Sequence, residues 1–253
     1  MMDSLVQIHR AAYTEDIPFW KSWTDRRDPI LELGCGFGRV TIPLSQEGHQ
    51  LVGLDTDWEC VRHLMAKLKE SDQDFQEQVL ILQADMLHFY TNPVFSAVLL
   101  PCNTYSVFST RDRQRLLVNV TRMLEKKGLF IISVPNPQRI TGIHENLRKK
   151  DIDPEPDLET VITHPKTSHP VQVSSQFVAT PDGVRWDWFY DQLFPDGRVD
   201  RIIRSTEHKL CSLEIYQREF QMVDLEVIAC LGDFNGAFYE DEAPYLILVG
   251  RRH

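Results

Sequence analysis

Three closely spaced glycines are the strongest chemical signal in the sequence. Gly34, Gly36 and Gly38 lie in the segment 32–39, which reads Glu-Leu-Gly-Cys-Gly-Phe-Gly-Arg and separates a short apolar run from a helix-like stretch. Glycine lets the backbone approach a ligand without a Cβ clash, and the first turn of a helix has free N–H groups. The segment therefore predicts a loop that cradles a bound small molecule.

The glycine spacing argues against two familiar nucleotide-binding loops. A nicotinamide dinucleotide loop has the spacing G-x-G-x-x-G, whereas here the third glycine comes one residue early and Arg39 occupies the expected place. A Walker phosphate loop ends in Gly-Lys-Ser/Thr, which this segment lacks. A nicotinamide-dependent oxidoreductase is therefore disfavoured.

Two carboxylates follow later apolar runs. Asp55 ends one predicted strand, where its carboxylate could accept hydrogen bonds from two vicinal hydroxyls of a ribose. Asp85 ends another and stands between Ala84 and Met86, whose small and apolar side chains suit contact with an adenine edge. Asp57 is better placed than Asp55 to cap the helix that follows.

These residues must be positioned by βα units, because the first 137 residues alternate short apolar runs with amphipathic stretches. We expect helices near 39–45 and 58–65, and another over 113–127 that Gly128 ends as a C-cap. The expected strands are 29–33, 50–55, 79–85, 97–100 and 129–134. Since open α/β sheets bind ligands at the carboxyl ends of parallel strands, the glycines and both carboxylates should share one edge.

An antiparallel meander is expected after residue 137. Two Pro-Asp-Gly turns separate β-rich runs at 171–180, 184–194 and 198–209. The central run places Val184, Trp186, Trp188 and Tyr190 on one face, which could pack the sheet or line a pocket. The charged stretch 140–165 is interpreted as a surface excursion, with its helix-like part ending at 151–156.

The closing segment predicts a helix near 212–222 and strands at 225–229 and 245–249, which would pair antiparallel and complete the main sheet. The predicted fold class is α/β: a doubly wound, Rossmann-like, seven-stranded sheet with an antiparallel last strand. An antiparallel β-meander lid is inserted after the fifth strand. We expect residues 1–137 and 211–253 to form the ligand-binding core, and residues 138–210 to form the inserted excursion and lid.

Composition narrows the class of protein and of partner. The chain has 253 residues and a formal net charge of −10, with 42% hydrophobic and 25% charged residues, which is typical of a globular protein. The acidic balance repels phosphate backbones, so a nucleic-acid partner is disfavoured. No segment approaches the ~20 uninterrupted apolar residues of a membrane span. The N-terminal residues lack the pattern of a secretory signal, so we expect a soluble, cytoplasmic protein.

Neither the cysteines nor the histidines predict a metal site. The nine histidines contain no helical i,i+4 pair with a third partner. His208, in the third meander strand, is kept as a weak candidate for a base. The cysteines are odd in number and form no Cys-x-x-Cys pair, so we interpret them as reduced thiols rather than zinc ligands or a disulfide framework. They are Cys35, Cys60, Cys102, Cys211 and Cys230.

The segment from about Tyr13 to Pro137 resembles a class I S-adenosylmethionine-dependent methyltransferase. The resemblance rests on the glycine segment 32–39, on Val-Gly-Leu-Asp at 52–55, on Ala-Asp-Met at 84–86 and on the late Gly-Leu-Phe-Ile-Ile run at 128–132. It extends to a small-molecule subgroup through the segments 16–20, 101–104 and 232–236. S-adenosyl-L-methionine, with S-adenosyl-L-homocysteine as product, is the cofactor that this resemblance implies.

The resemblance also implies roles for individual residues. The three glycines would lie under the methionine portion, Asp55 would hold the ribose, and Asp85 and Met86 would frame the adenine. The segment Pro101, Cys102 and Asn103 would pass the sulfonium and methyl group, and Asn103 is a weak catalytic candidate. The side chains of Tyr13, Trp20 and Arg39 could close over the methionine tail. The full implied cofactor set is Tyr13, Trp20, Gly34, Gly36, Gly38, Arg39, Asp55, Thr56, Ala84, Asp85, Met86, Pro101, Cys102 and Asn103.

The sequence departs from the related enzymes at two points. Thr56 and Asp57 follow the ribose-binding acid, where a small serine is commoner. The run Pro-Cys-Asn-Thr at 101–104 is not the Asn/Asp-Pro-Pro-Tyr/Phe signature of enzymes that methylate exocyclic amines of bases. The second departure further disfavours a nucleobase substrate.

The leading hypothesis is in-line methyl transfer to a small-molecule acceptor, with nitrogen favoured over oxygen. An oxygen acceptor would more often need a general base, and the sequence identifies none. The aromatic meander face could stabilise a cationic product. A protein or peptide methyltransferase and a catalytically silent cofactor-binding module stay open. The same face could instead pack on a second copy of the chain, so a homodimer stays open as well.

Overall fold

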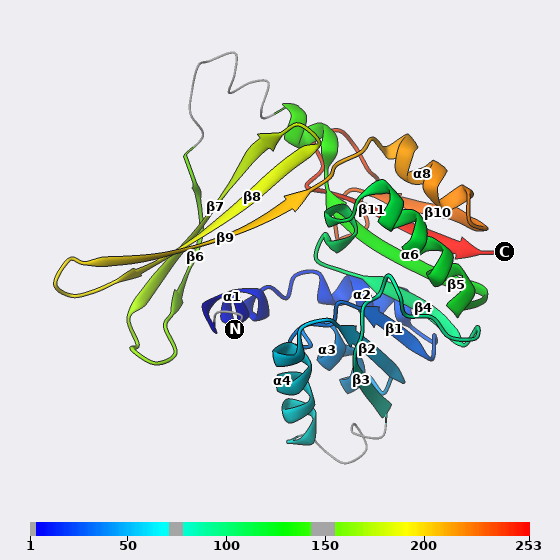
Figure 1. The fold of residues 1–253 in the computed structure, drawn as a ribbon, viewed down its shortest axis with the longest axis horizontal. Coiled ribbons are helices and arrows are strands. Elements are labelled where there is room, and N and C mark those ends of the chain that lie inside the picture. The colour runs from blue at the N-terminus through cyan, green and yellow to red at the C-terminus, as the bar shows by residue number, and fades with distance from the viewer. Residues whose placement is uncertain (1–3, 71–77, 143–154) are drawn as a thin grey trace. The chain divides into compact units, whose positions relative to one another are not determined.

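The chain divides into two compact units. The computed structural model describes residues 4–70, 78–142 and 155–253. One unit, here the glycine-loop unit, contains residues 14–136 and 212–253; the other, here the meander unit, contains residues 1–13 and 137–211 (Figure 1). In the part of the chain that the structure describes, no helix is long and apolar enough to cross a membrane.

A seven-stranded sheet forms the centre of the glycine-loop unit. Its strand order is β10-β11-β5-β4-β1-β2-β3. Six strands of this sheet run in one direction, whereas β11, which pairs antiparallel with both β5 and β10, runs in the opposite direction. The predicted fold class is therefore confirmed. The strands are β1 (Ile30–Leu33), β2 (Leu51–Asp55), β3 (Val79–Gln83), β4 (Phe95–Leu100), β5 (Leu124–Pro135), β10 (Leu225–Leu231) and β11 (Tyr245–Arg252).

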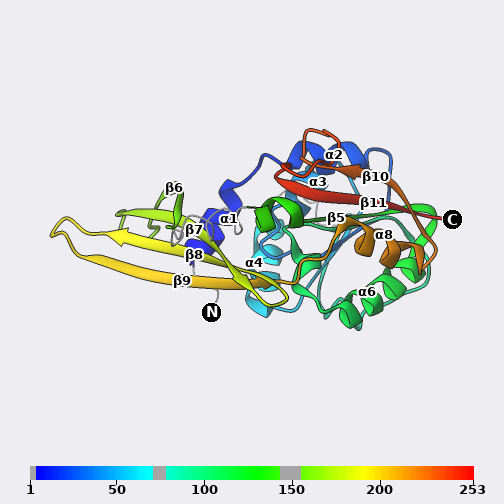
Figure 2. The same ribbon diagram turned by 90° about the horizontal axis from the view of Figure 1, so that it is seen from above.

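Helices cover both faces of this sheet, as Figure 2 shows for α2 and α3 on one face and α6 and α8 on the other. Alternation along β5 explains the arrangement, because neighbouring side chains in a strand point to opposite faces. Ile131 belongs to the same apolar cluster as Trp20 and Leu44, whereas the Phe130 ring stacks on Phe220. The helical segments are α2 (Ile17–Thr24), α3 (Thr41–Gln46), α4 (Trp58–Lys69), η1 (Thr104–Val107), α6 (Thr110–Met123) and α8 (Leu213–Gln221).

The junction between α6 and β5 differs from the sequence prediction. The helix ends at Met123 rather than near residue 127, and Gly128 lies inside β5 instead of capping the helix. Leu124 already has an extended backbone and pairs with Phe95 of β4. Local propensity favoured helix for Glu-Lys-Lys at 125–127, but these residues lie in an irregularity of the β4–β5 pairing, between the pairs Phe95–Leu124 and Ala97–Leu129, and Lys127 has a left-handed φ of 66°. A Cβ on Gly128 would also lie 2.9 Å from the Glu125 carbonyl oxygen.

The meander unit is built on a four-stranded antiparallel sheet of order β6-β7-β8-β9. The three predicted meander strands are β7 (Pro170–Thr180), β8 (Gly183–Leu193) and β9 (Val199–His208). The fourth, β6 (Asp157–Thr163), falls in the stretch that we interpreted as an irregular excursion. Most residues of β6 are exposed in the structure. A strand of this kind does not need alternating apolar residues, which is why its sequence did not predict it. The helix end predicted at 151–156 lies largely outside the described residues.

Helix α1 (Ser4–Ala12) packs on this second sheet. Leu5 and Val6 are buried in one apolar cluster with Val171, Val173 and Tyr190. The expected domain division placed residues 1–13 with the ligand-binding core, whereas the observed units group them with the meander. An amphipathic helix shows in its sequence which of its faces is buried, but not which sheet covers that face.

Candidate functional site

The glycine loop and Asp55 are brought together by the parallel pairing of β1 with β2. Leu33 at the end of β1 pairs with Leu54 of β2. The N–H groups of Gly34 and Cys35 both donate to the Leu54 carbonyl oxygen, at 2.8 and 2.9 Å. The loop therefore begins where the strand ladder stops, at the carboxyl edge where open α/β sheets bind ligands.

All three glycines of the loop have left-handed backbone conformations. Their φ angles are +73° for Gly34, +53° for Gly36 and +82° for Gly38, which residues with a Cβ rarely adopt. A Cβ on Gly38 would also lie 2.3 Å from Leu64 Cδ1 of α4. Gly38 thus lets the loop pack on α4, while Gly34 and Gly36 have no such close contact and are partly exposed.

Asp55 is fixed to this loop by its side chain. The Gly36 N–H donates to Asp55 Oδ2 at 2.8 Å, and the Asp57 N–H donates to Asp55 Oδ1 at 2.9 Å. An ionised carboxylate offers about four lone-pair sites, so both oxygens retain acceptor capacity for a diol. As predicted, Asp57 is the N-cap of α4, where its Oδ1 accepts from the Glu59 N–H at 2.9 Å.

Asp85 lies two residues beyond the end of β3, in a turn that its own carboxylate stabilises. Its oxygens accept from the Leu87 N–H at 2.9 Å and contact His88 Nδ1 at 2.8 Å. Partial burial acts to raise the pKa of Asp85, but these two hydrogen bonds outweigh it and lower the pKa. Met86 beside it is buried, with its Cε 3.5 Å from where a Cβ on Gly34 would be.

Two further predicted residues lie along this edge. Thr56 is exposed, and its carbonyl oxygen accepts from Gln83 Nε2 at 3.1 Å. The Ala84 N–H donates to the Asp55 carbonyl oxygen at 2.9 Å. The ends of β2 and β3 are therefore tied together next to the glycine loop.

Arg39 closes the loop against α2. Both of its terminal nitrogens bind the Asp16 carboxylate, with the NH2–Oδ2 distance at 2.8 Å. Burial acts to lower the pKa of Arg39, but the hydrogen bond from its guanidinium to Asp16 raises it. Trp20 was predicted to close over the ligand, but it is fully buried and donates to Asp16 Oδ2 at 2.8 Å. In this structure the indole holds the ion pair in place and has no accessible surface for a ligand.

The segment after β4 approaches the loop from the other side of β1. Cys102 and Asn103 both have left-handed φ angles, of 61° and 59°. Arg39 NH2 lies 3.1 Å from Cys102 Sγ, so this segment contacts the end of the glycine segment; the roles of Pro101, Cys102 and Asn103 toward a ligand stay predictions. Asn103 is only 8% exposed, and its Oδ1 is buried without a hydrogen-bond donor among the residues that the structure describes.

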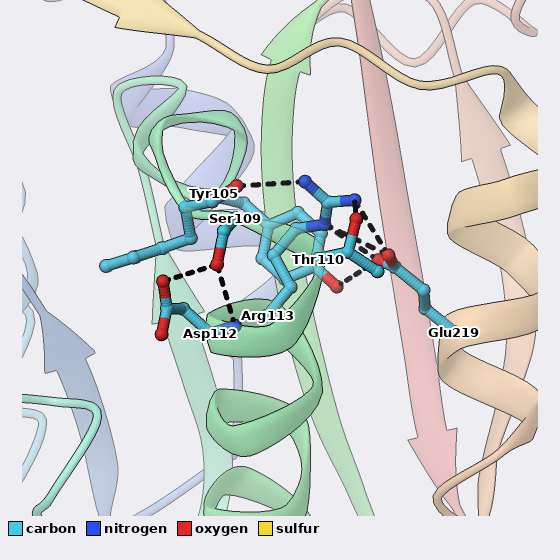
Figure 3. Close-up of polar contacts among 7 residues, drawn as sticks. Tyr105, Ser109, Thr110, Asp112, Arg113 and Glu219 are labelled. Atoms are coloured by element: carbon cyan, nitrogen blue, oxygen red, sulfur yellow. Dashed lines mark hydrogen bonds and ion pairs between the residues drawn. The ribbon is translucent and has the colours of Figure 1, made fainter. Parts of the chain in front are cut away.

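A buried ion pair positions the chain that follows Asn103 (Figure 3). Arg113 of α6 donates from Nε and NH2 to both oxygens of Glu219 of α8, at 2.8–3.1 Å. The Tyr105 hydroxyl of η1 donates to Glu219 Oε2 at 2.8 Å. Arg113 NH1 also donates to the Phe108 carbonyl oxygen at 3.0 Å. This network holds η1 against α6 and α8.

Glu32 is a buried acid that we did not predict as a site residue, although it opens the glycine segment. Its side chain accepts from Thr41 Oγ1 at 2.5 Å, and the residue is 3% exposed. Burial raises the pKa of Glu32 to about 8. The sequence did contain a signal for a buried acid here, because Glu32 is the one charged residue of the otherwise apolar strand β1.

Two predicted residues belong to the other unit. Tyr13 is the last residue of the N-terminal segment grouped with the meander, and His208 is buried at the end of β9. Their roles at the glycine loop stay predictions. Among the described residues, no group of three or more His, Cys, Asp or Glu side chains could hold a metal ion.

The predicted aromatic face of the meander forms a continuous row of rings. Centroid distances are 4.5 Å from Phe177 to Trp186, 4.9 Å from Trp186 to Trp188 and 4.8 Å from Trp188 to His9 of α1. His9 Nδ1 lies within hydrogen-bonding distance of the Tyr190 hydroxyl, at 3.1 Å. Burial lowers the pKa of His9, which keeps its ring neutral near pH 7.

Comparison with known proteins agrees with this geometry. Residues 30–128, which include the glycine loop, Asp55, Asp85 and Asn103, match the family model described as a methyltransferase domain. The protein YqeM of Bacillus subtilis (strain 168), which carries a methyltransferase name, is 26% identical over 140 residues. That alignment covers 53% of this chain and 55% of YqeM, so the chain spans about half the length of this curated relative.

Solved structures resemble the chain over nearly its whole length. CalS10 from Micromonospora echinaspora, described as an amino pentose methyltransferase with bound S-adenosylmethionine, aligns with a TM-score of 0.75 and 14% identity. This alignment covers 100% of the present chain and 98% of the CalS10 chain. The sugar N-methyltransferase KedS8 from Streptoalloteichus sp ATCC 53650 aligns with a TM-score of 0.73 and 17% identity, covering 100% and 94%. At these identities the likeness establishes a shared fold.

Proposed function

We propose that the chain is a class I S-adenosylmethionine-dependent methyltransferase that transfers a methyl group from S-adenosylmethionine to the nitrogen of a small-molecule amine. The match of residues 30–128 to a methyltransferase-domain family and the fold shared with CalS10 support this proposal. The observation that carries the proposal is the junction between the glycine loop and Asp55. There, a loop with three left-handed glycines, of which Gly34 and Gly36 are partly exposed, lies beside a carboxylate that is fixed by the Gly36 N–H and retains acceptor capacity.

The residues along this edge fit the cofactor. Asp55 would accept from the ribose hydroxyls, and the buried Met86 would face the adenine, with Asp85 beside it. The glycine loop would lie under the methionine portion, where the Arg39–Asp16 pair stabilises the loop. When bound, S-adenosylmethionine supplies a methyl group that is already activated by its sulfonium.

The protein's own contribution is mainly to align the acceptor and exclude water. Positioning of this kind contributes up to ~10 kcal/mol of barrier reduction. An amine acceptor becomes a cation as it is methylated, and carboxylates or aromatic faces stabilise a cation. Among the described residues we identify no base paired with the acceptor side of the glycine loop, which favours nitrogen over oxygen as the acceptor atom.

A small molecule suits the chain better than a nucleic acid as acceptor. The formal net charge of −10 opposes binding to a phosphate backbone. The printed names of CalS10 and KedS8 describe methylation of an amino pentose and of a sugar nitrogen. We infer that the acceptor is a cyclic amine about as large as one sugar ring.

Calorimetric titration tests the cofactor assignment directly. We expect S-adenosylmethionine and S-adenosylhomocysteine to bind the full chain with micromolar affinity and NAD not to bind. Asp55→Ala should abolish binding. Asp57→Ala is the matched control, since it removes a neighbouring carboxylate that caps α4 and has no predicted ligand contact. Binding of NAD alone, or unchanged binding in Asp55→Ala, would refute the assignment.

A further inference from the structure

The carboxamide of Asn103 is buried with an unused acceptor in the segment that follows β4, next to Cys102, which Arg39 of the glycine segment contacts. Its Oδ1 has no donor among the residues that the structure describes, although the residue is 8% exposed. Nearly all buried polar atoms in native proteins are hydrogen-bonded, and the exceptions call for an explanation. An acceptor left unpaired by the protein is explained if a ligand supplies the donor.

The backbone of Asn103 is held in an unfavourable conformation by its neighbours. It and Cys102 both have left-handed φ angles, which cost free energy for residues with a side chain. Ser106 holds the Asn103 carbonyl oxygen through its Oγ at 2.7 Å and its N–H at 3.2 Å. The Asn103 N–H approaches Ser133 Oγ of β5 at 3.4 Å. Conformational strain maintained in this way is concentrated at functional sites.

The position of β4 in the sheet indicates which part of the ligand lies near Asn103. Strand β1 has β2, with Asp55 at its end, on one side, and β4 on the other. If Asp55 holds the ribose, the end of β4 lies on the side away from the ribose. In the proposed function, the methyl group and its acceptor meet on this side.

We propose that Asn103 Oδ1 accepts a hydrogen bond from the N–H of the acceptor amine and thereby positions its nitrogen for attack. This inference rests on the proposed function. The nitrogen lone pair forms the new N–C bond, while the S–C bond breaks and leaves its electron pair on sulfur. The methylated nitrogen then carries the positive charge and releases a proton to solvent. Asn103 is a positioning residue, because a carboxamide cannot take up that proton.

Paired titrations with S-adenosylhomocysteine and sinefungin test this without knowledge of the acceptor. Sinefungin carries an amine where S-adenosylmethionine carries its methylated sulfur, whereas the two probes share the adenosine and the amino-acid end. We expect Asn103→Gly, which tolerates the left-handed backbone, to weaken sinefungin binding roughly tenfold and to change S-adenosylhomocysteine binding less than about twofold. Asn103→Asp keeps an acceptor oxygen and should retain sinefungin affinity.

Thr104→Val is the matched control, since it removes the bond from Thr104 Oγ1 to the Pro101 carbonyl oxygen in the same segment. Both probes should bind this variant as they bind the parent. Equal loss of both probes in Asn103→Gly would overturn the proposal, because Asn103 would then support the cofactor itself. Unchanged sinefungin binding would overturn it as well. If the parent chain binds neither probe, the proposed function fails independently of Asn103.

Discussion

At the scale of single residues, Asp55 shows how one side chain connects backbone geometry to ligand binding. Its two oxygens accept from Gly36 and Asp57, so the same carboxylate fixes the glycine loop and the start of α4. Removal of Asp55 would therefore affect both the ligand contact and the shape of the loop. Two residues flank the ligand contacts of the loop. Substitution of Gly38 tests the packing of the loop on α4, and substitution of Glu32 tests the ionisation of the buried acid before the loop.

Gly38→Ala should destabilise the protein by about 2–4 kcal/mol. The left-handed φ of +82° disfavours alanine, and the new Cβ would lie 2.3 Å from Leu64 Cδ1. Gly48→Ala is the control, because Gly48 has a similar φ of +88° with nothing within 4 Å of its Cβ position. It should cost only about 1–2 kcal/mol. Urea unfolding measures both losses, and equal losses would rule out the packing contribution.

Glu32 should make stability depend on pH. Burial raises its folded-state pKa to about 8 from an ordinary value of 4.5, so folding favours the protonated acid. The contribution of Glu32 to the free energy of unfolding is fully present below pH 4.5. It decreases as the pH rises to about 8, by up to ~1.4 kcal/mol per pH unit. Glu32→Gln removes this dependence.

Thermal and urea unfolding at pH 5.5 and pH 8 compare the two proteins. The stability of Glu32→Gln relative to the parent should increase between the two pH values. A constant difference would mean that Glu32 ionises normally in the folded protein.

At the scale of elements, the Arg113–Glu219 pair joins α6 to α8 and holds η1 through Tyr105 (Figure 3). Burial, followed by the neighbouring Glu219 charge, raises the pKa of Tyr105 well above its ordinary value. Tyr105 therefore stays a neutral donor to Glu219. The segment that carries Asn103 thus depends on α6, which follows it directly, and on α8, whose Glu219 lies 114 residues after Tyr105.

Arg113→Met should cost about 3–5 kcal/mol of stability, because it leaves the Glu219 carboxylate buried without its cation. The double variant Arg113→Met with Glu219→Leu should recover part of this loss, since it removes the uncompensated charge. Urea unfolding of the two single variants and the double variant gives the coupling between the residues. Additive losses would show that the pair contributes no mutual stabilisation.

At the scale of the whole molecule, the two units have separate apolar cores. The glycine-loop unit contains the Trp20 and Ile131 cluster, whereas Leu5 and Val6 of α1 complete the cluster under Val171 and Val173. The N-terminal helix thus belongs structurally to strands more than 150 residues later in the chain.

Leu5→Ala should loosen the meander unit specifically. Truncation of a buried leucine costs about 2–5 kcal/mol, and here the lost contacts are those with the β7–β8 face. Hydrogen exchange should become faster in β7 and β8 and stay unchanged in β4 and β5. Arg10→Ala, an exposed position on the same helix, serves as the control. Faster exchange in β4 and β5 would show that α1 stabilises the other unit.

Local patterns in the sequence determined most of the elements and the core of the site. Alternating apolar runs predicted the strands, and three glycines followed by Asp55 predicted the loop and its acidic partner. These signals are readable because strand periodicity, capping and glycine conformations depend on nearby residues.

Only the tertiary structure decided the remaining features. Pairing of Leu124 with Phe95 ended α6 early, and packing of α2 buried Trp20, whose indole donates to Asp16. The pairing of Arg113 with Glu219, the placement of α1 and the unpartnered Asn103 oxygen likewise required the fold. Each depends on which distant segments become neighbours, and contacts between such segments leave no periodic pattern in the sequence.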